Sequence, residues 1–196
     1  MSALGAHVID ADKVAREVTD RRETLEELAA AFGGWIIDES GRFNRAAASA
    51  RAFSDGAFLA RLTAITHKYI IEEIDGRIAA IRSAGTPGSG SAETSARRVI
   101  VIDAPIPVER GFLDISDVVW VVRAPRERRL ERVISRDNID AGAATARFAS
   151  QIADAGYDRL ADVIIDNGAG LDALEAEIRR RYQLLFAEGS GGSGRR

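Results

Sequence analysis

Two carboxylates separated by one residue end the first apolar run of this chain. Asp10 and Asp12 follow the run His7-Val8-Ile9. Alternate residues of an extended segment share a face, so the two acids can converge at the carboxyl end of a strand. Open α/β sheets place their chemistry at that end, which makes the pair a candidate set of catalytic acids.

A second acidic candidate follows another apolar run. Asp103 comes directly after residues 99–102, and Glu109 lies six positions further on, beyond the turn at Pro105. In phosphotransferases an acid at a strand end can orient Mg²⁺ or its waters. A loop-capping aspartate and a surface glutamate explain the same residues, so both interpretations remain open.

Arginine supplies nearly all of the positive charge, because Lys13 and Lys68 are the only lysines. A phosphate clamp would therefore be built mainly of arginine, whose planar fork suits bidentate oxyanion contacts. Most arginines of residues 126–137 fit a solvated, salt-bridged helix face. Arg136, at the end of that run, and Arg147 lie where a closing lid could bring charge onto a transferred phosphate.

Two further candidates lie between these groups. Arg45, together with Arg42, follows a turn and could bind phosphate, although charged loops are usually only solvated. His67 lies on a predicted helix, far from the only other histidine in a chain without cysteine. A metal role is therefore poorly supported, and a packed or ligand-contacting histidine is favoured.

One glycine-rich run resembles a phosphate-binding loop only in the spacing of its glycines. Gly85 and Gly90 have the spacing of a phosphate-binding P-loop, but Ser91 and Ala92 stand where lysine and Ser/Thr are needed. The run also precedes a strand, whereas a P-loop follows one. We predict a flexible loop insertion over 83–97 and a flexible tail over 189–196.

The elements that must position these residues alternate in type. Four Val/Ile-rich runs are nearly continuous in hydrophobicity, as in strands buried on both faces, and amphipathic helical patterns lie between and after them. This alternation predicts an α/β fold with a mostly parallel sheet in one domain, 1–188. The strands are expected at 7–9, 99–102, 118–122 and 163–165, and the helices at 14–32, 57–81, 125–134 and 171–186.

Composition excludes several classes of protein. The formal net charge of −3 gives no overall basic field, so no nucleic-acid partner is indicated. The absence of cysteine rules out disulfides and thiolate metal sites. No run approaches the roughly 20 apolar residues that span a bilayer, and no apolar signal region opens the chain. We therefore expect a cytoplasmic protein with no membrane partner.

Taken in order, these motifs resemble those of the dephospho-coenzyme A kinase family. Any single match is weak, but the ordered set is specific and covers nearly the whole chain. The matching positions are 8–12 with 15–18, 32–33, 41–45 with 53–55, His67, Asp103 with Pro105 and Glu109, Arg136 with Asp137, Arg147 with Gln151, and 161–167.

The resemblance implies a three-layer P-loop kinase fold with a lid and a helical substrate-binding region. It implies transfer of the ATP γ-phosphate to the ribose 3′-hydroxyl of dephospho-coenzyme A, with Mg²⁺ accompanying ATP, by a monomer or weak homo-oligomer. The resemblance implies that Asp12 orients or deprotonates the hydroxyl, with support from Asp10. Arg136 and Arg147 would neutralise phosphate charge, and Asp103 would belong to the magnesium shell. Asn167 would lie in the adenine-side loop, and substrate binding is implied for Arg45, His67 and Glu109.

The chain also departs from the family pattern. The family's first strand and P-loop should precede Gly5, where only Met1-Ser2-Ala3-Leu4 stand. That strand lies between the third and fourth, so its loss would leave backbone groups unpaired at about 1–3 kcal/mol each. We expect a chain that lacks its amino terminus and is inactive as it stands. A rearranged sheet, in which strands three and four pair directly, is the alternative.

Three hypotheses follow. The first is that the intact protein is an active kinase. The second is that the chain is a degenerate binding module, which keeps the acceptor pocket around Asp12, His67 and Arg45, and the third is that it is a structural remnant.

Overall fold

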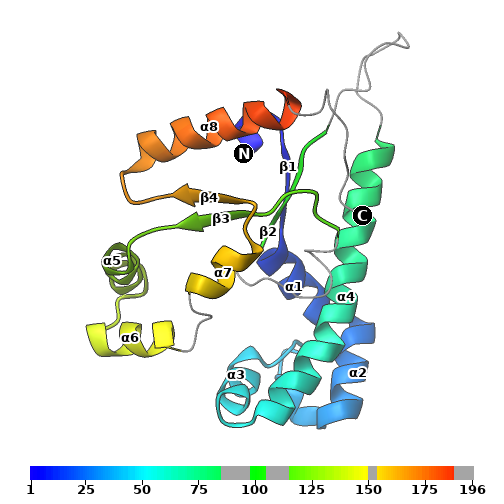
Figure 1. Cartoon of the computed structure of the whole chain (residues 1–196). Helices are drawn as coiled ribbons and strands as arrows, with labels where there is room; N and C mark the ends of the chain where they lie inside the picture. The colour runs from blue at the N-terminus through cyan, green and yellow to red at the C-terminus, as the bar shows by residue number, and fades with distance from the viewer. Residues whose placement is uncertain (85–97, 105–114, 150–153, 188–196) are drawn as a thin grey trace. The chain divides into compact units, whose positions relative to one another are not determined.

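The computed structural model describes residues 1–84, 98–104, 115–149 and 154–187 (Figure 1). The chain divides into two compact units, Met1–Ile106 and Pro107–Arg196, and each is described by itself. The prediction of one domain over 1–188 stays a prediction. The glycine-rich run beginning at Gly85, Glu109 and the tail lie outside the described residues.

Two parallel strands organise the first unit. β1 (His7–Asp10) pairs with β2 (Ile100–Asp103) in a register that sets Ile9 beside Ile102 and Asp10 beside Asp103. Parallel strands end at the same edge, so this register brings two of the predicted acids together. The parallel α/β class is confirmed. The four strands of the described residues form two parallel pairs, of which this is the first.

The prediction of one helix over 14–32 is wrong. The structure has α1 (Ala11–Thr19) and α2 (Arg22–Phe32), separated where Arg21 takes an extended conformation with φ −74° and ψ 147°. The break frees Asp20 to accept the backbone N–H of Phe43 at 3.0 Å. A contact 23 residues away in sequence thus stabilises the interruption, which local helical periodicity cannot reveal.

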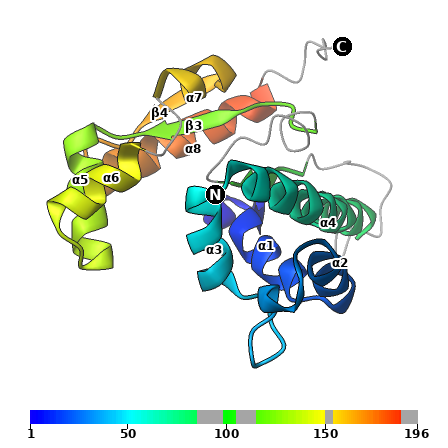
Figure 2. The same ribbon diagram turned by 90° about the horizontal axis from the view of Figure 1, so that it is seen from below.

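Helices α3 (Arg45–Ser54) and α4 (Gly56–Ser83) complete the helical part of this unit, with short 3₁₀ helices η1 (Ser2–Leu4) and η2 (Gly34–Ile36). α4 lies alongside α1 and α2 (Figure 2). The buried residues between α2, η2, α3 and α4 form a small apolar core of Leu28, Ile36, Ala48, Phe58 and Ile65. Asp55 begins α4 by accepting the N–H of Phe58 at 2.9 Å.

Ion pairs join α1 and the start of α2 to α4. Arg21 donates to Glu73 at 2.5 Å, Arg77 donates to Glu73 at 2.7 Å, and Arg77 also pairs with Glu17. The same face of α1 buries Val14 and Val18 completely. This packing determines which side of α1 is exposed to solvent.

The second unit repeats the parallel-pair arrangement. β3 (Trp120–Arg123) pairs in parallel with β4 (Val163–Asp166), and α8 (Leu171–Ala187) lies along this pair (Figure 1). Helices α5 (Arg126–Asp137), α6 (Ala141–Ala149) and α7 (Asp154–Leu160) complete it. Within the described residues, no helix is both long enough and apolar enough to cross a bilayer.

Candidate functional site

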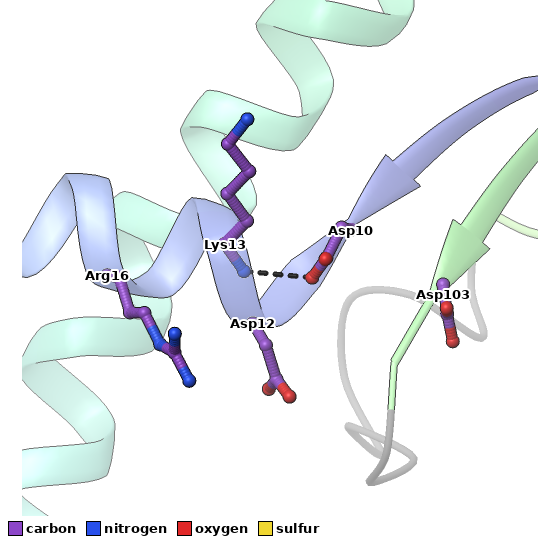
Figure 3. Close-up of a pocket in the computed structure, with 5 residues that line it drawn as sticks. All are labelled: Asp10, Asp12, Lys13, Arg16 and Asp103. Atoms are coloured by element: carbon purple, nitrogen blue, oxygen red, sulfur yellow. Dashed lines mark hydrogen bonds between the residues drawn. The ribbon is translucent and has the colours of Figure 1, made fainter.

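A pocket of about 410 Å³ lies at the carboxyl end of the β1–β2 pair (Figure 3). Five residues of the first unit line it: Asp10, Asp12, Lys13, Arg16 and Asp103. The structure therefore brings together the three acids that the sequence placed at two separate strand ends. Their convergence depends on the parallel register, which sets Asp10 beside Asp103.

The acid pair at the start of α1 has two different local roles. Asp10 is the N-cap of α1, and its Oδ1 accepts the backbone N–H of Lys13 at 2.9 Å. An aspartate in this position satisfies one of the free N–H groups that open every helix. Asp10 is thus occupied by the backbone and shapes the strand-to-helix junction.

Asp12 lies in the first turn of α1, at the helix end that carries a partial positive charge. Its side chain is exposed to the pocket and, in the described part of the chain, has no hydrogen-bond or ion-pair partner. A free carboxylate of this kind can accept a hydrogen bond, and then a proton, from a hydroxyl group in the pocket.

Asp103 adds a second exposed carboxylate at the end of β2. Among the described residues, no three His, Cys, Asp or Glu side chains are grouped so that they could hold a metal ion. The donor chemistry nevertheless suits Mg²⁺, which is usually held by one or two carboxylates while phosphates and waters complete its octahedron. Asp103 is therefore suited to an ion that arrives with a phosphate ligand.

Sequence reasoning did not select Lys13 and Arg16 as lining residues. Burial of Ala11, Val14 and Val18 turns the opposite side of α1 towards solvent. Asp12 and Arg16, four residues apart, extend to the same side of α1, whereas the Lys13 side chain extends away from them (Figure 3). This four-residue spacing of acid and base was the signal available in the sequence.

Arg45 does not line the pocket. Its guanidinium donates to Thr19 Oγ1 at 2.8 and 3.1 Å, to the backbone carbonyl of Arg16 at 2.9 Å, and to Asp20 at 3.3 Å. These contacts connect the start of α3 to the last turn of α1, where Arg45 and Thr19 both donate to the carbonyl of Arg16. The geometry makes Arg45 an anchor of the helix that presents Asp12 and Arg16.

His67 lies on α4 and is also outside the set of residues that line the pocket. Its ring is partly buried, and this desolvation lowers the pKa of the imidazole below its usual value. The neutral form is therefore favoured. Substrate binding by His67 stays a prediction.

The predicted residues of the second unit are placed within that unit only. Arg136, in the last turn of α5, donates to the carboxylate of Asp137 at 2.7 Å, and this partner raises the pKa of its guanidinium. Arg147 lies in α6. Asn167 follows β4, donates its N–H to the carbonyl of Arg123 at 2.6 Å, and accepts from Arg132 at 3.2 Å.

Comparisons with known proteins give a consistent result. The family model for dephospho-CoA kinase matches residues 1–173. A dephospho-CoA kinase of Moorella thermoacetica is 34% identical over 183 residues, which are 93% of this chain and 82% of that protein. One of Deinococcus radiodurans is 37% identical over 181 residues, which are 92% and 81% of the two chains.

Two solved structures resemble the fold. TT1252 from Thermus thermophilus has a TM-score of 0.72 at 24% identity, with 97% of this chain and 88% of that chain covered. A dephospho-CoA kinase from Campylobacter jejuni has a TM-score of 0.65 at 23% identity, with 97% and 89% covered. At these identities the likeness establishes the fold alone.

Proposed function

The chain belongs to the dephospho-CoA kinase family, and on this premise we propose that it phosphorylates the ribose 3′-hydroxyl of dephospho-CoA with ATP. The single observation that carries the proposal for this chain is the free carboxylate of Asp12 in a pocket at the strand ends. The family match supplies the substrates, ATP and dephospho-CoA, and the pocket supplies a group able to activate the acceptor hydroxyl.

In the proposed reaction the 3′-hydroxyl oxygen forms a bond to the γ-phosphorus as the bond from that phosphorus to the β–γ bridging oxygen breaks. ADP leaves with the bridging oxygen. The hydroxyl proton passes to Asp12, which orients the nucleophile before transfer. Phosphoryl transfer has a loose transition state, so orientation and charge stabilisation account for most of the catalysis.

The remaining predicted residues have proposed roles. Asp103 would hold the Mg²⁺ that accompanies ATP, since a carboxylate at this strand end suits that ion. Arg136 and Arg147 would neutralise charge on the transferred phosphate, and Asn167 would contact the adenine side of ATP. His67 and Glu109 would belong to the substrate region.

A non-catalytic acceptor-binding module is the second candidate, and one sequence observation favours it. Neither Lys13 nor Lys68 follows a glycine, so these 196 residues contain no Gly-Lys pair with which to form a P-loop. Such a module would keep the acceptor pocket without supplying the usual backbone cradle for the phosphates of ATP.

Two measurements on the full chain separate these functions. Calorimetry with dephospho-CoA alone measures acceptor binding, and an ADP-release assay with ATP, Mg²⁺ and dephospho-CoA measures turnover. CoA in the product, identified by mass spectrometry, supports the kinase. Binding without turnover supports the module. Failure to bind at millimolar dephospho-CoA, together with absence of turnover, overturns both.

A further inference from the structure

We propose that Arg16 contacts the 5′-diphosphate of the acceptor nucleotide and thereby sets the position of the 3′-hydroxyl beside Asp12. This inference rests on the proposed function and deepens it, because it names the group that recognises the substrate's anionic part. Neither the sequence motifs nor the family match assigns a role to this arginine.

The position of Arg16 within the pocket is the first observation. Its side chain lines the pocket together with Asp12 and Asp103 and extends to the same side of α1 as Asp12 (Figure 3). In the described residues the Arg16 guanidinium has no hydrogen-bond or ion-pair partner of its own, although most neighbouring arginines of this unit are paired. An arginine left free in a pocket is available for an anionic ligand.

The spacing from Asp12 matches the chemistry of the acceptor. Residues four apart on a helix have Cβ atoms about 5–6 Å apart. In dephospho-CoA the 3′-hydroxyl and the 5′-diphosphate are attached to the same ribose ring. A nucleotide whose 3′-hydroxyl lies against Asp12 can therefore place its diphosphate near the next turn of α1, where Arg16 stands.

The chemistry of the side chain favours a phosphate over a carboxylate of the protein itself. Asp12 and Arg16 have the spacing of an intrahelical ion pair, yet no such pair forms in the described part of the chain. The guanidinium offers two parallel N–H donors that match two oxygens of a phosphate. Lys13, the other cation at the pocket, extends in another direction (Figure 3).

The backbone under Arg16 is held from outside the pocket. Its carbonyl accepts from Arg45 at 2.9 Å, and Thr19 donates to the same carbonyl at 3.3 Å. These contacts fix the last turn of α1 without using the Arg16 side chain. The guanidinium thus extends from a restrained backbone, which reduces the ordering cost of binding.

The test is calorimetry of the full chain with dephospho-CoA in the absence of ATP. Arg16→Gln should bind about tenfold more weakly than the wild type, since a charge-assisted hydrogen bond is lost at a solvent-accessible site. Arg16→Lys should fall between the two, because it keeps the charge and loses the fork. The difference between wild type and Arg16→Gln should shrink as salt is raised.

Arg22→Gln is the matched control, because it removes the same charge from an exposed position on α2, where Arg22 pairs with Glu26 of the same helix. It should bind dephospho-CoA like the wild type. Circular dichroism checks that both variants are folded. Equal binding by Arg16→Gln and wild type, or an equal loss in Arg22→Gln, overturns the inference.

The design also separates this inference from the proposed function. A loss in Arg16→Gln that appears only when ATP is present assigns the arginine to the donor phosphate and overturns the acceptor contact. Wild-type binding with no effect of Arg16→Gln refutes the inference and leaves the proposed function standing. A wild-type chain that does not bind dephospho-CoA refutes both.

Discussion

Replacement of Arg45 by alanine tests whether this residue anchors α1, as its contacts indicate, or serves the pocket directly. The substitution removes donors to Thr19, to the carbonyl of Arg16 and to Asp20. Thr19 is buried, whereas the Arg45 side chain is 39% exposed and the Asp20 side chain is 25% exposed. The losses are therefore unequal among the three partners.

The magnitude follows from these exposures. An average intramolecular hydrogen bond contributes about 0.5–1.5 kcal/mol, and water can replace Arg45 at Asp20 and partly at the Arg16 carbonyl. The buried Thr19 oxygen loses its donor with less compensation. We expect Arg45→Ala to lower the free energy of unfolding by about 1–2 kcal/mol.

The assay uses the two tryptophans of the chain, Trp35 in the first unit and Trp120 in the second. In a Trp120→Phe background, urea unfolding followed by fluorescence reports on the unit that contains Arg45. Arg22→Ala is the control and should leave the unfolding midpoint unchanged, because the Arg22 side chain is 89% exposed and pairs with Glu26 of the same helix. If Arg45→Ala and Arg22→Ala have the same midpoint, the anchoring argument is refuted.

Three further predictions concern the acceptor hydroxyl, the partly buried histidine and the start of α4. Asp12→Asn should lower kcat for CoA formation about a hundredfold or more, while the Kd for dephospho-CoA from calorimetry changes only a few-fold; an unaltered kcat would exclude Asp12 as the base. Partial burial lowers the pKa of the His67 imidazole. As the pH falls, the unfolded chain therefore protonates this ring at a higher pH than the folded chain does. Stability should therefore fall as pH drops through about 6.5 towards the folded-state pKa, and His67→Gln should flatten that part of a stability curve from urea unfolding. Asp55→Ala removes the N-cap of α4 and should lower Tm, whereas Asp55→Asn should keep most of it, because asparagine caps helices equally well; equal Tm values for the two variants would contradict the capping role.

The acids of the pocket were predictable from the sequence, although the reason for their convergence differs from the one first given. Alternation along a strand was expected to bring Asp10 and Asp12 together. The chain instead changes from strand to helix between them, and Asp10 caps the helix that carries Asp12. Asp103 joins them through the register of β1 and β2, which follows from the parallel α/β pattern.

Contacts between distant segments could not be predicted from local patterns. The role of Arg45 depends on Thr19 and Asp20, which lie 26 and 25 residues away in sequence. The break between α1 and α2 depends on the same aspartate. Arg16 was overlooked because a single arginine on an amphipathic helix resembles any solvated residue until the burial of Val14 and Val18 fixes which face is open.

The direct junction between β1 and α1 restricts how this site can change. β1 ends at Asp10 and α1 begins at Ala11, with no loop between them. Each residue added to a helix advances its side chains by about 100° around the axis. One residue inserted at this junction would therefore rotate Asp12 and Arg16 away from Asp103 or force Val14 and Val18 out of the core. Substitutions can alter the chemistry of this pocket, but packing fixes the number of residues at the junction between β1 and α1.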